Sequence, residues 1–220
     1  MSETVLDRLR RLDSCAVSDA MDRLGLPGAV TGIAPRSARQ RIAGRVRTVK
    51  LEAARGRTAT RHLCTAAIEA AEAGDVIVVE QKSGIDAAGW GGILSIGAQA
   101  KGIAGVIVDG PARDIDEASE LGFPVYARSA TARTARGRII EVATGAAVTI
   151  GDITVVPGDC ALADSSGVVF IPAAELERVL AEAERITARE GAMAKAARAG
   201  DPMSQVMGAD YERMLKKEAY

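Results

Sequence analysis

The sequence predicts an α/β fold in which buried strands alternate with helices before the chain changes to a series of short strands. Residues 75–80 (DVIVVE) and 104–109 (AGVIVD) are rich in Val and Ile and lack polar alternation, as strands covered on both faces do. Helical patterns follow both strands. Further on, Gly145, Gly151 and Gly158 separate short apolar runs, which is typical of strands joined by tight turns.

Two helices are predicted at the N-terminus. Leu6, Leu9 and Leu12 recur at helical spacing, and a second helix at residues 17–24 ends before Gly25. Between these helices and the first buried strand, we expect a strand at residues 45–51 and an Ala-rich helix at residues 60–73.

The central elements follow the two buried strands. A glycine-rich loop at residues 83–92 (SGIDAAGWGG) leads into a predicted helix at residues 93–101. After the second buried strand, Gly110 and Pro111 predict a turn. A helix at residues 114–121 and a short strand at residues 123–127 complete this region.

The C-terminal part combines short strands with polar helices. Short strands are expected at residues 139–142, 147–150, 153–156 and 168–171. A long helix follows Pro172, and one of its faces carries Leu176, Val179, Leu180, Ala183 and Ile186. Its charged continuation at residues 189–198 and a last helix at residues 205–217 carry little apolar surface, so we expect them to rest on another subunit of a homo-oligomer. No linker divides the chain, which indicates a single domain over residues 1–220, with a core at about 1–172 and a helical tail at 173–220.

Composition excludes several classes of partner. The chain has 28 Lys and Arg against 29 Asp and Glu, and only one Trp, three Tyr and two Phe, so neither a basic field nor stacking platforms point to nucleic acid. No apolar run approaches the length of about 20 residues that a membrane helix needs. Residues 1–14 have no signal-peptide core, and the three cysteines are widely spaced, which favours free thiols in the cytoplasm.

One segment is locally basic. Residues 36–61 hold nine Lys or Arg and one acid, Glu52. These side chains are either ordinary solvated strand and loop positions or a rim that attracts an anionic substrate or partner.

Motifs for several common chemistries are missing. His62 is the only histidine, so paired-histidine zinc sites and Ser-His-Asp triads have little to draw on. Neither a G-x-x-x-x-G-K-[ST] loop nor a G-x-G-x-x-G loop is present, so nucleotide binding is unsupported.

Two loops remain as candidates for a site. In the first, Gly89, Trp90, Gly91 and Gly92 precede a helix, and glycines there let backbone N–H groups surround a carboxylate or phosphate at a helix N-terminus. The same sequence also suits a plain tight turn. Trp90 is either a wall of the pocket or an anchor of the core.

The second loop follows the buried strand that ends at Asp109. Arg113 offers a planar fork for a carboxylate, and Asp114 offers the hard oxygen that Mg²⁺ prefers. Ligands of α/β folds collect at the carboxyl ends of strands, where this pair lies. The alternative is a surface turn in which Asp114 caps the next helix.

The run GWGGILSIGAQAKGIAGVIVDGPARDIDE, with CAVSDAMDRLG and EAGDVIVVE before it, resembles the family of 4-hydroxy-4-methyl-2-oxoglutarate aldolase and the RraA regulators of ribonuclease E. The similarity covers about residues 12–156. It implies a layered αββα sandwich of the swivelling β/β/α type. It also implies trimers or hexamers whose C-terminal helices pack on a neighbouring subunit and whose sites lie between subunits.

The resemblance implies a metal-dependent site. Asp114 would bind Mg²⁺, Mn²⁺ or another divalent cation, and Arg113 would bind the pyruvate portion of a 2-oxo acid. The backbone amides of Ile93 and Leu94, directly after Gly91 and Gly92, would hold the substrate carboxylate. An acid from the C-terminal helix of a neighbouring subunit would complete the site: Glu190 is expected, with Glu182 and Glu184 nearby.

The sequence departs from the family at one position. The aldolases place an aspartate twenty-one positions before the arginine, and here that position is Gly92. One carboxylate near the metal is therefore missing, and Asp86 in the same loop is a candidate to replace it.

These observations predict a divalent-metal-dependent carbon–carbon lyase that performs class II-type retro-aldol cleavage or decarboxylation of a 2-oxo acid and releases pyruvate or a related enolate product. Two alternatives stay open. One is a non-catalytic, RraA-like regulator that binds a protein, and the other is a lyase or isomerase that acts on a larger, pathway-specific substrate.

Overall fold

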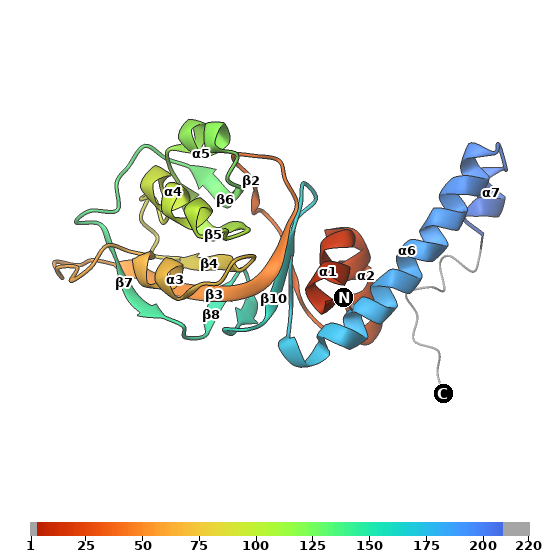
Figure 1. Ribbon diagram of the computed structural model, residues 1–220, viewed down its shortest axis with the longest axis horizontal. Helices are drawn as coiled ribbons and strands as arrows, with labels where there is room; N and C mark the ends of the chain where they lie inside the picture. Colours follow the sequence, from red (N-terminus) through yellow and green to blue (C-terminus); the bar gives the residue numbers. More distant parts are fainter. Residues whose placement is uncertain (1–3, 209–220) are drawn as a thin grey trace.

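The computed structural model describes residues 4–208, which fold into a mixed α/β structure around one curled sheet (Figure 1). Two helices, α1 (Val5–Arg11) and α2 (Ser14–Leu24), come first, as expected. The alternating region then runs through β3 (Ile42–Ala53), α3 (Thr65–Ala70), β4 (Val76–Gln81), α4 (Gly92–Ala100), β5 (Gly105–Ala112), α5 (Ile115–Leu121) and β6 (Val125–Ala130).

Strands β3, β4, β5 and β6 pair in parallel in that order, with one helix between each consecutive pair. Their carboxyl ends therefore meet at one edge of the sheet. The glycine-rich loop follows β4 and Arg113 follows β5 at this edge, so the topology brings together two segments about twenty residues apart.

The remaining strands extend and fold over the sheet. They are β1 (Ala29–Val30), β2 (Ala34–Pro35), β7 (Ile139–Thr144), β8 (Val148–Ile150), β9 (Ile153–Val155), β10 (Cys160–Ala163) and β11 (Val168–Ile171). Strand β10 pairs antiparallel with the start of β3, from Ile42 to Arg45, whereas β4 pairs with β3 from Val46 onward. The long strand β3 thus belongs to both halves of the sheet, which curls around it.

Three apolar clusters explain the layering. One lies between β3–β6 and the helices α3, α4 and α5. Another fills the inside of the curl and includes Val78, Ile107 and Phe170. The third packs α1, α2 and α6 (Leu176–Arg198) against β10 and β11 on the opposite side. Helices therefore cover both outer faces (Figure 1), and the mixed α/β class is confirmed.

The tail begins with a short 3₁₀ turn, η1 (Ala173–Glu175), and continues into α6, where the five predicted apolar positions are all buried. Beyond Ile186 the helix projects away from the sheet and ends near α7 (Met203–Val206) (Figure 1). The predicted last helix at residues 205–217 overlaps only the end of α7, and its part from residue 209 onward lies outside the described residues. None of the helices that the structure describes is long and apolar enough to cross a membrane.

Two of the predicted segments take a different structure. The helix predicted at residues 60–73 is confined to Thr65–Ala70. It begins late because Cys64 takes a left-handed conformation (φ 65°) and the Glu141 carboxylate accepts a hydrogen bond from the Cys64 amide, and it ends early because Ala71 is extended. The predicted turn at Gly110 and Pro111 is wrong: β5 continues through both residues to Ala112, with a register shift against β6 after Val108.

Candidate functional site

Arg113 and Asp114 lie at the carboxyl end of β5, beside the glycine-rich loop. The amide of Gly89 donates a hydrogen bond to the carbonyl of Pro111 at 2.8 Å, and the amide of Arg113 donates to the carbonyl of Trp90 at 3.0 Å. These bonds need β5 to continue through Pro111. The extension of the strand, in place of the predicted turn, therefore holds the two loops together.

Asp114 has an unusual backbone for a residue other than glycine, with φ 56° and ψ 44°. This conformation turns its side chain away from α5, which has no side-chain cap, so the predicted helix-capping alternative is wrong. The carboxylate instead accepts a hydrogen bond from the amide of Gly92 at 2.8 Å, at the first residue of α4. Both of its oxygens also lie 3.1 Å from Nε of Arg113. Backbone strain of this kind is concentrated at functional sites.

Gly91 and Gly92 permit this close approach. A Cβ atom on Gly91 would lie 2.9 Å from Oδ2 of Asp114, and one on Gly92 would lie 2.1 Å from Oε2 of Glu117. Side chains at these positions would therefore push the two acids away from the loop.

The same geometry leaves donors available for a ligand. Gly91 is the N-cap of α4 and offers no side-chain cap, and the amides of Ile93 and Leu94 have no acceptor within residues 4–208. In the same part of the chain, the two terminal nitrogens of Arg113 form no hydrogen bond or ion pair. A carboxylate could accept from these amides while a second oxygen faces the guanidinium.

A cavity of about 250 Å³ opens at this point. Its lining includes His62, Trp90, Gly91, Gly92, Ile93, Leu94, Arg113, Asp114 and Arg136. The structure therefore brings together every site residue that the two loops were expected to supply.

Trp90 is both core anchor and cavity wall. It is buried, stacks on Phe123 with the ring centroids 6.2 Å apart, and donates a hydrogen bond from Nε1 to Oγ of Ser95 at 2.9 Å. The thiol of Cys64 supports the loop from below by donating to the carbonyl of Gly89 at 3.6 Å. Burial, and then the charge of Glu141, raises the pKa of Cys64 well above its usual value, so this thiol stays protonated.

The cavity adjoins a second one of about 410 Å³, and both are lined by His62 and Arg136. His62 lies in the loop before α3 rather than on a helix, and its Nδ1 lies 3.0 Å from the carbonyl of Leu63. Sequence reasoning did not single out Arg136. Its side chain is exposed and has no ion-pair partner among the described residues, which makes it available to an anionic group.

The predicted acids of α6 lie far from Asp114 in the same subunit, because α6 and α4 are on opposite faces of the sheet (Figure 1). Glu184 pairs with Arg8, and Glu182 pairs with Arg23 and Arg185. Glu190 forms no ion pair within the described part of the chain. Burial, then the nearby carboxylates of Asp19 and Asp13, raise the pKa of Glu190 above its usual value.

Asp86 does not replace the missing carboxylate at position 92. Its carboxylate faces Arg133 at 3.5 Å, and its side chain is 55% exposed. The acid that the fold brings to Gly92 is Glu117, on the first turn of α5. The signal for it in the sequence was its spacing, three residues after Asp114 on a predicted helix, which places the two side chains on neighbouring positions.

The donor set suits a hard, hydrated cation. No cluster of three or more His, Cys, Asp or Glu side chains occurs within residues 4–208, so a metal here would take few ligands from one chain. Mg²⁺ is commonly bound through one or two carboxylates while it keeps several waters or substrate oxygens. The Asp114 carboxylate, beside side-chain-free Gly91 and Gly92, fits that pattern.

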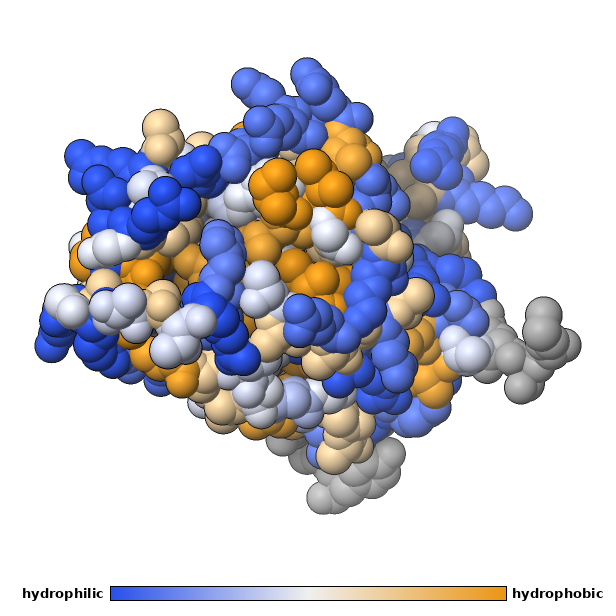
Figure 2. All heavy atoms as spheres, turned by 60° about the vertical axis from the view of Figure 1, so that its left-hand side comes forward, coloured by the Kyte–Doolittle hydropathy of each residue, from blue (hydrophilic) through white to orange (hydrophobic). Residues whose placement is uncertain are grey.

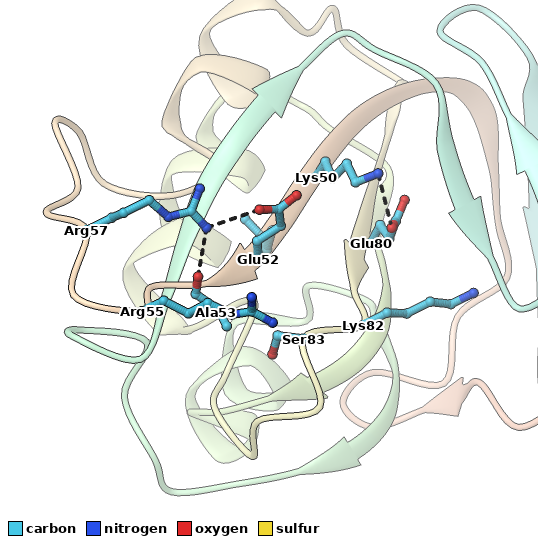
Figure 3. A pocket seen from close by; sticks show the side chains of 9 residues that line it. Lys50, Glu52, Ala53, Arg55, Arg57, Glu80, Lys82 and Ser83 are labelled. Atoms are coloured by element: carbon cyan, nitrogen blue, oxygen red, sulfur yellow. Dashed lines mark hydrogen bonds and ion pairs between the residues drawn. The ribbon is translucent and has the colours of Figure 1, made fainter.

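A separate cavity of about 520 Å³ lies where β3 and β4 end, and the predicted site residues take no part in it (Figure 3). Its cations are largely neutralised: Lys50 lies 3.6 Å from Glu80 and Arg57 lies 3.0 Å from Glu52, while Arg55 also lines it. Five of the nine basic residues at 36–61 form ion pairs with acids of the chain (Arg41, Arg47, Lys50, Arg57 and Arg61), so much of the charge of this segment is balanced internally.

Comparisons with known proteins identify the family of the chain. The model of the RraA-like family, described as Aldolase/RraA, matches residues 14–170. A protein of Halalkalibacterium halodurans named "Putative 4-hydroxy-4-methyl-2-oxoglutarate aldolase" is 30% identical, over 89% of this chain and 91% of its own length. Protein DlpA of Legionella pneumophila is 27% identical over 93% of this chain, and the chain spans only 34% of the length of DlpA.

Two crystal structures share the fold over most of their length. An uncharacterized protein from Pseudomonas syringae pv. tomato superposes with a TM-score of 0.84 at 31% identity, covering 94% of this chain and 98% of that one. Streptomyces coelicolor RraAS2, described as an unusual member of the RNase ES inhibitor RraA protein family, has a TM-score of 0.77 at 26% identity, covering 87% and 96%.

Proposed function

Because the chain belongs to the RraA-like family of aldolases and RraA proteins, we propose that it is a divalent-metal-dependent carbon–carbon lyase acting on a 2-oxo acid at Arg113 and Asp114. The reaction is retro-aldol cleavage, decarboxylation or both, with pyruvate or a related enolate as product.

The strained backbone of Asp114 is the observation that carries this proposal. At φ 56° it aims one carboxylate at the N-terminus of α4 and holds it against the Arg113 guanidinium. An acid, an arginine and two unused amides thus converge on one cavity. A merely structural turn would not need this combination.

Each group of the site has its own role in the proposed reaction. The amides of Ile93 and Leu94 donate hydrogen bonds to the substrate carboxylate, and the terminal nitrogens of Arg113 donate to the keto oxygen of the substrate. When the carbon–carbon bond breaks, its electron pair moves toward the carbonyl carbon and negative charge develops on that keto oxygen. Preorganised donors aimed at developing charge contribute most to such a step. Mg²⁺ or Mn²⁺ held by Asp114 would supply Lewis-acid stabilisation of the same charge.

In the retro-aldol direction the substrate hydroxyl must also lose a proton. We propose that Glu190 of the partner subunit assists removal of this proton, because Glu182 and Glu184 are already paired within their own chain. This requires a homo-oligomer, a trimer or a hexamer, in which α6 of one copy reaches α4 of the next. The three free cysteines are consistent with a cytoplasmic enzyme.

The second cavity, of about 410 Å³, indicates which class of substrate would fit the site. Arg57, Arg61 and Arg136 line it, and Arg57 and Arg61 pair with Glu52 and Glu141. The guanidinium of Arg136 remains available at the junction of the two cavities. We therefore propose a diacid, such as a hydroxy-oxo diacid or oxaloacetate, whose second carboxylate faces Arg136.

A coupled assay for pyruvate release tests the proposal, with a panel of hydroxy-oxo diacids and oxaloacetate measured with and without chelator. We expect metal-dependent turnover that Asp114→Ala abolishes and that Arg113→Ala lowers by about 100-fold or more. Asp116→Ala is the matched control, since it removes an exposed acid of the same helix. Turnover that survives in both Asp114→Ala and Arg113→Ala would refute the proposal.

A second candidate is a non-catalytic regulator, favoured by Gly92 in place of a carboxylate and by the similarity to RraAS2. Thermal unfolding separates the two. The lyase predicts stabilisation that needs Mg²⁺ and oxalate together, since oxalate mimics the enolate of pyruvate and binding to the native state raises the unfolding temperature. A regulator predicts no response to the pair.

A further inference from the structure

We infer that Gln81 is a positioning residue, which holds the glycine-rich loop in the shape that presents the amides of Ile93 and Leu94 to a carboxylate. The inference rests on the proposed function, because it takes those two amides as donors to the substrate. Gln81 is the last residue of β4 and does not itself line the cavity that contains Asp114.

The side chain of Gln81 uses its whole hydrogen-bonding capacity on this loop. Gln81 is 4% exposed. Its Nε2 donates to the carbonyl of Ile85 at 3.2 Å and to the carbonyl of Ala87 at 2.6 Å. Its Oε1 accepts from the amide of Ser83 at 3.3 Å and from the hydroxyl of Ser83 at 3.1 Å. A side-chain amide has two donor hydrogens and two acceptor lone pairs, so one loop engages all four.

These hydrogen bonds require an amide rather than a carboxylate. The carbonyls of Ile85 and Ala87 can only accept, and within residues 4–208 they receive no other hydrogen bond. A buried carbonyl without a donor is unfavourable, because it has lost its water and gained no partner. If Gln81 lost its NH₂ group, the loop would therefore have to change shape to reach water.

The packing of Gln81 connects it to both segments of the site. A Cβ atom on Gly89, in the glycine-rich loop, would lie 3.3 Å from Cγ of Gln81. A Cβ atom on Gly110, in β5, would lie 2.8 Å from Cβ of Gln81. Gln81 thus packs against two glycines, one of them three residues before Gly92 and the other three residues before Arg113.

Gln81 also holds the part of the loop that β5 does not reach. From Gly89 onward the loop is hydrogen-bonded to the end of β5 and to the residue after it. Residues 83–87 form no hydrogen bond between backbone groups within the described part of the chain. Their polar anchors are the exposed ion pair of Asp86 with Arg133 and the buried side chain of Gln81. Donors act only when they are held in place, and a misplacement of about 1 Å can cost about 100-fold in rate.

Binding of oxalate to the full chain in excess Mn²⁺, measured by isothermal titration calorimetry, tests this positioning role. Gln81→Glu keeps the shape of the side chain and removes its donors, so we expect the Kd of oxalate to rise about tenfold or more through the displaced amides. The Kd of Mn²⁺ alone should change much less, because Asp114 follows β5 and not the loop. Gln40→Glu makes the same chemical change at an exposed residue and should leave both constants within about twofold.

Gln81→Met supplies a second, uncharged variant that also lacks the donors, and it should raise the Kd of oxalate as well. A purely structural role of Gln81 predicts a lower unfolding temperature with an unchanged Kd of oxalate for the folded protein. That result, in whichever of the two variants folds, would overturn the inference and leave the proposed function standing. A wild-type chain that binds no oxalate in excess Mn²⁺ would overturn the proposed function, and the inference with it.

Discussion

At the scale of single residues, the site depends on which charged groups are already satisfied. Arg113 donates to the Asp114 carboxylate only through Nε, which leaves the two terminal nitrogens of the guanidinium for a ligand. Arg136 lacks a partner in the described part of the chain, whereas Arg133 on the same loop faces Asp86 at 3.5 Å. Residue type alone does not distinguish these arginines. Their partners in the folded chain distinguish them.

Arg136 gives the first prediction. We expect Arg136→Gln to raise KM for a diacid substrate about tenfold and to change kcat much less, because a charge-assisted hydrogen bond to a remote carboxylate contributes about 1.5–3 kcal/mol to binding. Steady-state kinetics of pyruvate release measures both constants. Arg133→Gln is the control and should leave KM unchanged. Equal effects of the two substitutions would mean that Arg136 does not meet the substrate.

Asp164 gives a prediction about acid stability. Burial alone would raise the pKa of Asp164, but hydrogen bonds from Ser14 and Ser166 and the charge of Arg41 outweigh it and lower the pKa below 3.8. A lowered carboxyl pKa stabilises the fold fully above the unfolded value and loses that effect as pH falls through the folded value.

Asp164→Asn should therefore reduce the free energy of unfolding by about 1–2 kcal/mol near neutral pH. As the pH falls below the lowered pKa of folded Asp164, the difference between the two proteins should disappear, because Asp164 is then protonated in both states. Urea titrations at several pH values measure this difference. A difference that stayed constant with pH would show that shape, and not charge, accounts for the role of Asp164.

At the scale of elements, the sequence predicted the parts of the fold whose side-chain pattern is local. The strands β4, β5 and β11 and the helices α2 and α6 lie close to their expected positions, because apolar periodicity and glycine stops mark them. Strand β10 was missed: Cys160–Ala163 is short, shows no alternation, and forms a strand only because β3 and β11 flank it.

The site shows the same limit. Arg113, Asp114 and the glycine loop could be predicted because strand ends and glycine runs are visible in sequence. The extension of β5 through Pro111 could not, since a tertiary hydrogen bond from Gly89 stabilises it. The closeness of Glu117 to Gly92 was overlooked because it depends on the packing of α5 on α4.

Gly44 gives a prediction about how β3 packs. A Cβ atom there would lie 2.0 Å from the carbonyl oxygen of Gly74, a backbone atom that cannot move aside easily. Gly44→Ala should lower the free energy of unfolding by about 1–3 kcal/mol. Gly97→Ala, in α4 with open space around it, should be neutral or stabilising by up to about 1 kcal/mol. Denaturant unfolding measures both values, and similar values would contradict the packing described for β3.

At the scale of the whole molecule, the fold separates the parts of the proposed site. The cavity with Asp114 lies on the side of α4 and α5, while Glu190 lies on α6 across the sheet (Figure 1). Ile93 and Ile96 on α4 are 82% and 53% exposed, and Ile93 lines that cavity. The face that carries α4 shows apolar surface edged by hydrophilic side chains (Figure 2). A second copy that covers α4 would bring its Glu190 to Asp114 and would bury the exposed apolar surface of α4.

Self-association is therefore expected, and Ile96 should contribute to it. Ile96→Asp should shift the chain toward monomer and lower turnover, because a charge on a buried interface loses solvation without a partner. Val156→Asp, which changes another exposed apolar residue far from α4 in the sequence, should leave the mass unchanged. Light scattering after size exclusion measures the mass, and a monomeric wild-type chain with full activity would contradict this account.

The most direct test of the central claim is a crystal of the protein soaked in Mn²⁺ and oxalate, measured at a wavelength where manganese scatters anomalously. We expect an anomalous peak beside the Asp114 carboxylate, with oxalate between the metal, the Arg113 guanidinium and the amides of Ile93 and Leu94. A fully soaked crystal with no anomalous density near Asp114 would contradict the assignment of this corner as a metal-dependent lyase site.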